Sequence, residues 1–223
     1  MVVAPKAPND APEDSADERE PSRGQRWYAA SFVGALALLG WSAKVAHTHR
    51  LAGWETLIFR HINNWPDSLH IVFRVSSIAK NSLLIGVLAV VITFVLRQWR
   101  LTYRLAVAIL AGAVLTALLK HEIARPRPAQ LLSNVHVRWS DTGMGFPSGH
   151  AMMMSVVMLT IVPLFPRRWR WVPFLAIGLM MLSRVYLGLH APLDVLGGFA
   201  VGVLVVSGLH IVPKSLKKPL RLE

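Results

Sequence analysis

The sequence has no cysteine and few charged residues. Without cysteine in its 223 residues, the protein has no disulfide and no thiolate metal site. Only 16% of the residues are charged and 53% are hydrophobic, whereas a typical soluble domain has about a quarter charged residues. Too little polar sequence is left to cover a soluble core, and we therefore expect most of the chain to lie in a membrane.

The first 26 residues lack apolar runs and differ from the rest of the chain. Prolines alternate there with aspartate and glutamate, and such a segment has little to bury. We predict a disordered cytoplasmic tail over residues 1–26, a membrane domain over 27–213 and a basic cytoplasmic tail over 214–223.

Uncharged runs recur along the predicted membrane domain. They are somewhat shorter than the roughly 20 residues that span a bilayer, although lysine and arginine at their ends can extend to the surface. Backbone groups in lipid must be satisfied within the segment, so the runs predict helices. The predicted fold class is all-α, an integral membrane six-helix bundle with spans at 27–43, 81–96, 105–119, 151–166, 171–183 and 195–209.

The stretch between the first two spans has a different pattern. Its large apolar residues recur at helical spacing, which predicts an additional amphipathic helix at the membrane interface; they are Leu51, Trp54, Ile58 and Ile62. Pro66 and Asp67 resemble a helix start, so the second span begins either near Ser68 or only at Asn81.

Six spans bring the polar junctions to one membrane face. The end of the third span, the start of the fourth, the end of the fifth and the start of the sixth all lie on the same side. These junctions contain the polar segments 120–128, 147–150 and 183–194. The short connections 97–104 and 167–170 on the other side are dense in arginine, which is typical of cytoplasmic loops. We therefore expect an inner (plasma) membrane protein with cytoplasmic termini and the polar face outside.

Three cations at the predicted helix ends indicate an anion site. Lys120, Arg127 and Arg184 are costly near lipid unless they share an anion, and guanidinium groups suit phosphate oxygens. Acidic partners near them are few: Glu122, Asp141 and Asp194. Ser148 and the backbone N–H groups that follow it can add an anion site at a helix N-terminus.

Two histidines accompany these cations. If a helix begins near Pro192, Asp194 lies in its first turn and can hold one ring nitrogen of His190, which leaves the other nitrogen free to attack phosphorus. His150 then gives a proton to the leaving oxygen. Each segment alone also has a structural interpretation, as an interfacial anchor, a capped turn or a hydrogen bond at a helix start. Their occurrence together, at helix ends on one face, favours catalysis.

The three segments resemble the signature of the type 2 phosphatidic acid phosphatase and vanadium haloperoxidase superfamily. The pattern is Lys-x6-Arg-Pro, Pro-Ser-Gly-His and Ser-Arg-x5-His-x3-Asp, and every fixed position is present: Lys120, Arg127, Pro128, Pro147, Ser148, Gly149, His150, Ser183, Arg184, His190 and Asp194. The resemblance implies that His190 is the nucleophile, Asp194 orients it and His150 is the general acid. It implies phosphate contacts from Lys120, Arg127, Ser148, Gly149 and Arg184, with no metal and no other cofactor.

The resemblance leaves several functions open. It favours a lipid phosphate or diphosphate phosphatase, with undecaprenyl diphosphate as the leading substrate and phosphatidylglycerophosphate or phosphatidic acid as alternatives. A lipid-to-lipid phosphotransferase has the same intermediate. The membrane runs disfavour a soluble haloperoxidase, and a lipid-phosphate binding or transport protein has no need of two histidines and an aspartate together. No nucleic-acid partner is expected, and the oligomeric state is open.

Overall fold

The computed structural model describes residues 22–75, 82–139 and 142–211. Within these ranges the chain forms helices joined by loops and contains no strand, which confirms the predicted all-α class. The predictions for the two tails, for Asn81 as a span start and for Asp141 as an acidic partner fall wholly or largely outside the described residues. Every predicted catalytic or phosphate-binding residue lies within them.

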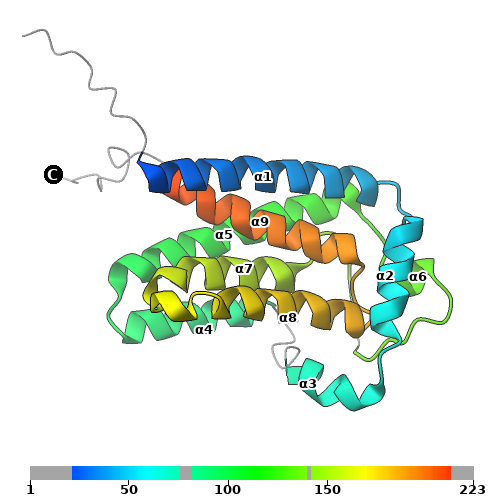
Figure 1. Ribbon diagram of the computed structural model, residues 1–223. Coiled ribbons are helices and arrows are strands. Elements are labelled where there is room, and N and C mark those ends of the chain that lie inside the picture. The colour runs from blue at the N-terminus through cyan, green and yellow to red at the C-terminus, as the bar shows by residue number, and fades with distance from the viewer. Residues whose placement is uncertain (1–21, 76–81, 140–141, 212–223) are drawn as a thin grey trace, which may run out of the picture.

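The long helices run side by side along one axis (Figure 1). They are α1 (Arg23–Ala46), α4 (Ser82–Val95), α5 (Trp99–Ile123), α7 (Gly149–Ile161), α8 (Val172–Tyr186) and α9 (Pro192–Ile211). The short helices α2 (Gly53–Asn63), α3 (His70–Val75) and α6 (Pro128–Leu131) gather at one end of this bundle. Single 3₁₀ turns occur at Asp67–Leu69, Val162–Leu164 and Arg167–Trp169.

Several bundle helices are suited to a membrane. Helices α1 and α9, and the helical stretch Trp99–Leu131 that includes α5, are long and apolar enough to cross one, while Ser82–Val95 and Gly149–Leu164 are apolar but shorter. Large apolar side chains are exposed along α1, α4 and α5, among them Val33, Val87 and Leu110. Lipid is the solvent that such surfaces need.

Helix α7 lies at the centre and packs against α4, α5, α8 and α9. Its contact with α9 is close because Gly198 and Gly202, one turn apart, face it. A Cβ at Gly198 would collide with the Ser148 carbonyl, and a Cβ at Gly202 would collide with the Ser155 side chain. Small residues at this spacing let membrane helices approach closely. The crossing fixes the start of α9 against the start of α7.

Helix α1 begins earlier than the predicted first span. Ser22 and Gln25 form a reciprocal capping box, so the helix starts at Arg23 and runs to Ala46, beyond the predicted 27–43 at both ends. Helix α1 packs against α9 along the bundle. Tyr28 stacks on His210 with ring centroids 4.1 Å apart, which joins the start of α1 to the end of α9.

Helix α2 lies across one end of the bundle, in the stretch where an amphipathic helix was predicted (Figure 1). It buries Glu55, Phe59 and Asn63 against α8 and α9, while Trp54 and Ile58 stay exposed on its outer side. The structure thus has an unexpected acid on the inner face of α2. After α2, Asp67 starts a 3₁₀ turn that leads into the separate short helix α3. Among the described residues, α4 begins at Ser82.

Candidate active site

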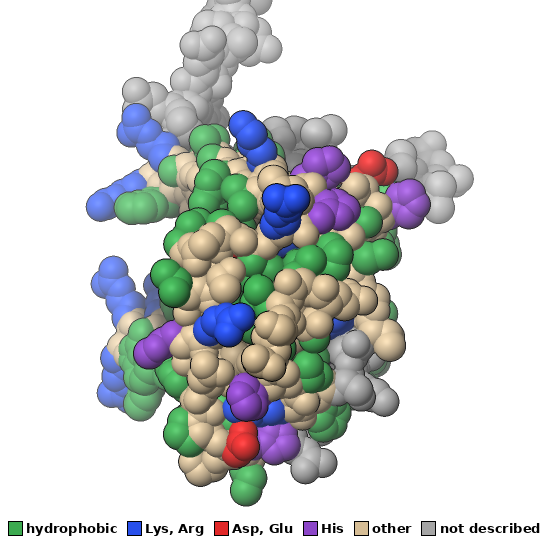
Figure 2. Space-filling model, turned by 90° about the vertical axis from the view of Figure 1, so that its right-hand side faces the viewer, with side chains coloured by type: hydrophobic (Ala, Val, Ile, Leu, Met, Phe, Trp, Pro, Cys, Tyr) green, Lys and Arg blue, Asp and Glu red, His purple; other side chains and the backbone are tan. Residues whose placement is uncertain are grey.

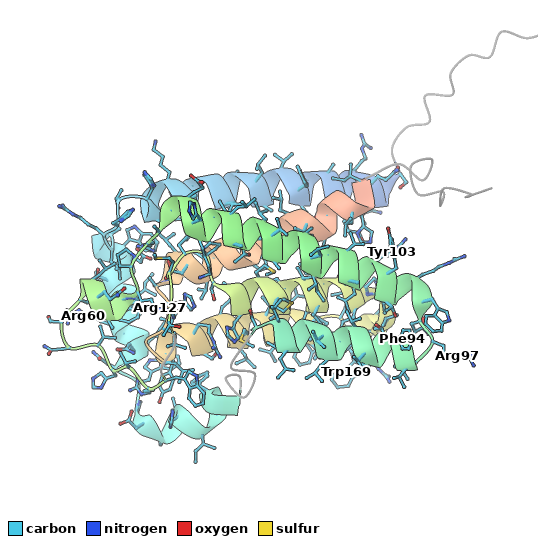
Figure 3. The ribbon with its side chains drawn as sticks, turned by 180° about the vertical axis from the view of Figure 1, so that it is seen from behind. Arg60, Phe94, Arg97, Tyr103, Arg127 and Trp169 are labelled. Atoms are coloured by element: carbon cyan, nitrogen blue, oxygen red, sulfur yellow. The ribbon has the colours of Figure 1, made fainter. Side chains whose placement is uncertain are left out.

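The polar junctions meet at one end of the bundle. The end of α5, the start of α7, the end of α8 and the start of α9 lie together next to α2 and α6 (Figure 1). Figure 2 looks onto this end, where Lys, Arg and His side chains are spread among apolar and polar neighbours. Arg127 lies here, whereas Arg97 and Tyr103 lie at the opposite end (Figure 3). The predicted gathering of the three segments is thus present in the structure.

The end of α5 provides two of the predicted cations. Ala124 has left-handed dihedrals (φ 46°, ψ 35°) and ends the helix just after Lys120, whose Nζ donates to the Met144 carbonyl at 2.6 Å. Arg127 spans the neighbouring loop. Its guanidinium donates to the carbonyls of Gly143, Thr142 and Leu189, each at 3.0 Å. Lys120 and Arg127 therefore hold the loop that precedes α7 over the site.

The start of α7 adds a buried hydroxyl. Ser148 is the N-cap residue, at a helix N-terminus as predicted, and α7 begins at Gly149, two residues before the predicted span 151–166. The Ser148 N–H donates to the Asp194 carbonyl at 2.8 Å, but the Ser148 Oγ is buried and makes no hydrogen bond within the described chain. His150 follows in the first turn and is 6% exposed. The first N–H groups of a helix have no intrahelical acceptor, so this turn suits an anion.

The connection between α8 and α9 carries the second histidine. The Arg184 side chain is buried, and its carbonyl accepts from the N–H groups of Leu189 at 3.1 Å and His190 at 3.3 Å. Helix α9 begins at Pro192 with Asp194 in its first turn. The predicted order, with His190 just before the helix and Asp194 just inside it, is present. These backbone bonds place His190 beside Arg184.

The His190 ring has a defined orientation. Its Nδ1 lies 2.8 Å from the Gly145 carbonyl oxygen and 3.7 Å from Asp194 Oδ2. A carbonyl only accepts hydrogen bonds, so Nδ1 carries the proton and Nε2 of the neutral ring has a free lone pair. The structure differs here from the sequence-based expectation, because Gly145 rather than Asp194 makes the hydrogen bond to Nδ1.

The surroundings of His190 favour the neutral imidazole. Burial of the ring lowers the pKa of His190 below its ordinary value, since the charged form loses its hydration. Arg127 and Lys120 repel a second positive charge and lower this pKa further, while Asp194 opposes both effects. The net direction is downward, so the ring keeps a free lone pair at neutral pH.

A buried ion-pair network stands behind His190 and was not predicted. The Arg125 guanidinium is fully buried and forms two hydrogen bonds to the Glu55 carboxylate, at 3.0 and 2.7 Å. It also donates to Asp194 Oδ1 at 2.9 Å and to the Arg50 carbonyl at 2.9 Å. The other Asp194 oxygen accepts from the Ala191 N–H at 2.7 Å. Both oxygens of Asp194 are therefore fixed.

One signal in the sequence could have suggested this network. Neither Arg125 nor Glu55 was predicted to contribute to the site, and the acids expected near its cations were Glu122, Asp141 and Asp194. Glu55 is the only acid within the predicted amphipathic segment. A charge in such a segment requires a partner if its side chain faces inward. By contrast, the expected partner Glu122 is exposed and lies beside His121 at 3.6 Å.

A second arginine at this end holds the outer loops together. Arg138 donates to Asp67 at 2.8 Å and to the carbonyls of Asn63, Tyr186 and Trp65, and its guanidinium lies 4.3 Å from the centroid of the Tyr186 ring. Asp67 is exposed, and Arg138 lowers its pKa by a hydrogen bond and by its charge. This cluster joins the loop before Trp139 to α2 and α8.

An open cavity of about 420 Å³ adjoins Arg127, and its lining includes Gln130, Trp139 and Leu189. It lies directly beside the His190 connection, since Leu189 precedes His190.

As for metal ligands, the residues described by the structure contain no group of three or more His, Cys, Asp or Glu side chains placed to hold an ion.

A comparison with known families decides the relationship. The sequence profile of the PAP2 superfamily matches residues 101–217. The chain belongs to the PAP2 superfamily. The matched region contains every predicted catalytic and phosphate-binding residue from Lys120 to Asp194. The predicted family is therefore confirmed.

Individual PAP2 relatives agree with this placement. The chain is 28% identical over 154 residues to an undecaprenyl-diphosphatase from Sulfolobus acidocaldarius, an alignment that covers 67% of this chain and 74% of the relative. It is 35% identical over 102 residues to phosphatidylglycerophosphatase B from Bacillus subtilis, covering 41% and 48%. Among solved structures it is similar to Aquifex aeolicus LpxE, with a TM-score of 0.64 and 27% identity over 75% of this chain and 97% of LpxE.

These findings fix the class of the protein. It is an enzyme, a phosphoric ester hydrolase of a lipid phosphatase family, as predicted. Its apolar helices and its PAP2 membership make it a membrane protein.

Proposed function

We propose that this PAP2 member hydrolyses a lipid diphosphate or phosphate through a phosphohistidine on His190. One observation carries the proposal: the Gly145 carbonyl accepts a hydrogen bond from Nδ1 of the buried His190 ring. Nε2 of the same ring therefore keeps a free lone pair. In the same connection, the Arg127 guanidinium donates to the Leu189 carbonyl, and the Arg184 backbone carbonyl accepts from the Leu189 and His190 N–H groups. A neutral imidazole beside cations is suited to attack a bound phosphate.

The phosphoryl group would be held by the predicted cations and by the start of α7. Lys120, Arg127 and Arg184 balance its negative charge, and their donors stabilise the equatorial oxygens as phosphorus is attacked. The Ser148 hydroxyl is buried and has no hydrogen-bond partner among the described residues, which supports a role as a donor to phosphate. The N–H groups that begin with Gly149 add further donors.

In the first step, the lone pair on His190 Nε2 attacks phosphorus and forms the P–N bond. The bond from phosphorus to the leaving oxygen breaks, and protonated His150 gives its proton to that oxygen. For a lipid diphosphate the leaving group is the lipid monophosphate. Asp194, 3.7 Å from Nδ1, balances the positive charge that the His190 ring gains.

In the second step, water displaces His190. His150, now neutral, accepts a proton from the water as its oxygen attacks phosphorus. The P–N bond breaks, inorganic phosphate leaves, and both histidines return to their starting states. No metal or other cofactor is required by this sequence of steps.

Undecaprenyl diphosphate is the proposed substrate. The similarity to an undecaprenyl-diphosphatase over 67% of the chain supports it. The shorter similarity to phosphatidylglycerophosphatase B supports phosphatidylglycerophosphate as the alternative. In either case the phosphate would enter from the membrane surface while the lipid chain stays in the bilayer, and the cavity beside Arg127 and Trp139 offers room for the rest of the headgroup.

We propose the same membrane arrangement as the sequence predicts. Helices α1, α4, α5, α7, α8 and α9 are the six spans, and α2 lies at the interface with Trp54 and Ile58 toward lipid. The arginine-rich connections near Arg97 and Trp169 lie opposite Arg127, which supports cytoplasmic termini and an active site outside (Figure 3). Cysteine-accessibility labelling at Arg97 and at Gln130 in intact cells tests this. Labelling of Gln130→Cys alone is expected, and labelling of Arg97→Cys alone would reverse the orientation.

Phosphate release by the purified protein in detergent tests the function. Each lipid is supplied alone: undecaprenyl diphosphate, phosphatidylglycerophosphate and phosphatidic acid. We expect free phosphate to be released fastest from undecaprenyl diphosphate, without added metal. Release only when a second lipid acceptor is present would indicate a phosphotransferase. Binding without release from any lipid would indicate a carrier.

A further inference from the structure

The buried carboxylate of Glu55 has no part in the family signature or in the steps above. It is fully buried on α2 and accepts from three donors. Two are Arg125 nitrogens, and the third is the Leu193 N–H at 3.1 Å. Leu193 lies next to Asp194 in the first turn of α9. Glu55 is therefore linked to Asp194 through Arg125, and it also contacts the first turn of α9 directly through the Leu193 N–H.

Charge balance explains why such a carboxylate is needed. Arg125 Nη1 donates to Asp194 Oδ1 at 2.9 Å, and an arginine this close would neutralise much of the negative charge of Asp194. Glu55 binds the same guanidinium with both oxygens and satisfies its positive charge. The three groups together carry one net negative charge, beside the His190 ring. Arg125 can then fix the position of Asp194 without removing its effect on His190.

We propose that Glu55 and Arg125 are positioning residues that set the orientation and the effective charge of Asp194, and through it the proton affinity of His190. This rests on the proposed function of His190 as nucleophile. Helix α2 thereby becomes part of the catalytic apparatus, although it lies across the bundle and outside the signature (Figure 1).

The proposal predicts opposite effects from two substitutions in one ion pair. Glu55→Gln keeps an oxygen for Leu193 and Arg125 Nη1 but removes the charge, so Arg125 neutralises Asp194 and the His190 ring loses protons more readily. The acid limb of the kcat/KM profile then moves to lower pH by about one pH unit. Arg125→Met leaves two negative charges near His190, and the acid limb moves to higher pH.

The double variant Glu55→Gln, Arg125→Met distinguishes an effect of net charge from an effect of structural disruption. It restores one net negative charge, so the acid limb returns close to the wild-type position. Other charged or titratable groups around His190 stay unchanged in all three variants: Lys120 on α5, Arg127 before α6, His150 on α7 and Arg184 on α8. Asp67→Asn, which breaks the exposed ion pair with Arg138, is the matched control and leaves the limb in place.

The experiment measures kcat/KM against pH for the full chain in detergent with the best lipid of the panel. In parallel, NMR of ¹⁵N-labelled histidine follows the protonation of the His190 ring without substrate. Shifts in opposite directions, with reversal in the double variant, support the proposal. Equal loss of kcat without movement of the limb or of the His190 titration would overturn it and leave Glu55 with a structural role only. A wild-type protein that releases no phosphate would refute the proposed function, and the NMR titration would still decide the role of Glu55.

Discussion

Arg125 and Arg138 lie at the same end of the molecule but have different roles. Arg125 is fully buried and binds two buried carboxylates, one of which stands beside His190. Arg138 is nearly buried, but its acidic partner Asp67 is 83% exposed, and its remaining bonds go to backbone carbonyls. An exposed ion pair is weakened by water and salt. The first cluster is therefore suited to the positioning role proposed for it, and the second joins loops.

The contrast also explains the difference between Arg125 and Arg127, two residues apart. Arg127 donates to the backbone carbonyls of Thr142, Gly143 and Leu189. Carbonyls hold a guanidinium without cancelling its charge, so these three bonds are compatible with the phosphate contact proposed for Arg127. The positive charge of Arg125 is balanced by the carboxylates of Glu55 and Asp194, so it does not attract a substrate phosphate. In the proposed roles, partner type more than sequence position distinguishes the substrate-binding Arg127 from the positioning Arg125.

The largest expected effect comes from removing the nucleophile at this end. His190→Ala lowers kcat on the order of 10⁴-fold or more, because no other side chain in the proposed steps replaces Nε2. His121→Ala is the matched control: it removes an exposed histidine near the same end and leaves kcat unchanged. Phosphate release under saturating lipid measures both. Substantial turnover by His190→Ala would contradict the assignment.

The two arginine clusters are compared directly by Arg125→Met and Arg138→Met. Arg125→Met leaves two buried carboxylates without their partner, which costs about 3–5 kcal/mol of the free energy of unfolding and also lowers kcat per folded molecule. Arg138→Met leaves only an exposed carboxylate unpaired, so it lowers stability less and keeps kcat within about threefold. Thermal unfolding and active-fraction assays measure both. Similar kcat losses in the two variants would remove the distinction.

A smaller effect is expected at the buried hydroxyl. Ser148→Ala lowers kcat/KM by about 10²-fold if Ser148 Oγ donates to phosphate in the transition state. The hydroxyl makes no bond within the described chain, so its loss leaves stability almost unchanged. Ser155→Ala on the same helix is the control, because that hydroxyl donates to the Ala151 carbonyl. An unaltered kcat/KM in Ser148→Ala would exclude the contact.

The smallest effect concerns pH. Burial and the two neighbouring cations lower the pKa of His190, so the neutral ring persists below the ordinary histidine value of about 6.5. Activity therefore stays constant as pH falls to that value and declines only below it. The acid limb of kcat/KM measures this. A limb above about 6.5 would mean that Asp194 outweighs burial and the cations.

Local sequence patterns predict the helix starts at this site well. A Ser-Gly-His turn and a His-x3-Asp connection, each followed by an apolar run, place Ser148 as a cap and Asp194 in a first turn, as observed. These features depend on neighbours in the chain. The signature also predicts the residues that gather, because alternating crossings bring those junctions to one face.

Contacts between distant segments were not predictable in the same way. Glu55 and Arg125 are separated by 70 positions. The single acid of the amphipathic segment indicates that a partner is needed, but no pattern identifies Arg125 as that partner. The hydrogen bond from His190 to the Gly145 carbonyl depends on how the loop before α7 folds back. Lys120 and Arg127 donate to carbonyls of this loop, and the Gly145 N–H donates to the Arg125 carbonyl. The sequence shows that Asp194 is near His190, but only the fold shows that the Gly145 carbonyl accepts the hydrogen bond from His190 Nδ1.

The most direct test of the whole account is to locate the phosphoenzyme. The protein is mixed with a lipid diphosphate that carries an isotopic label in its terminal phosphate, and the reaction is quenched in base within one turnover. The labelled peptide is then located by mass spectrometry. The account predicts a phosphate on His190 that is stable in base, labile in acid and absent from His190→Ala. A phosphate on His150, a serine or an aspartate, or turnover without any phosphoenzyme, would contradict it.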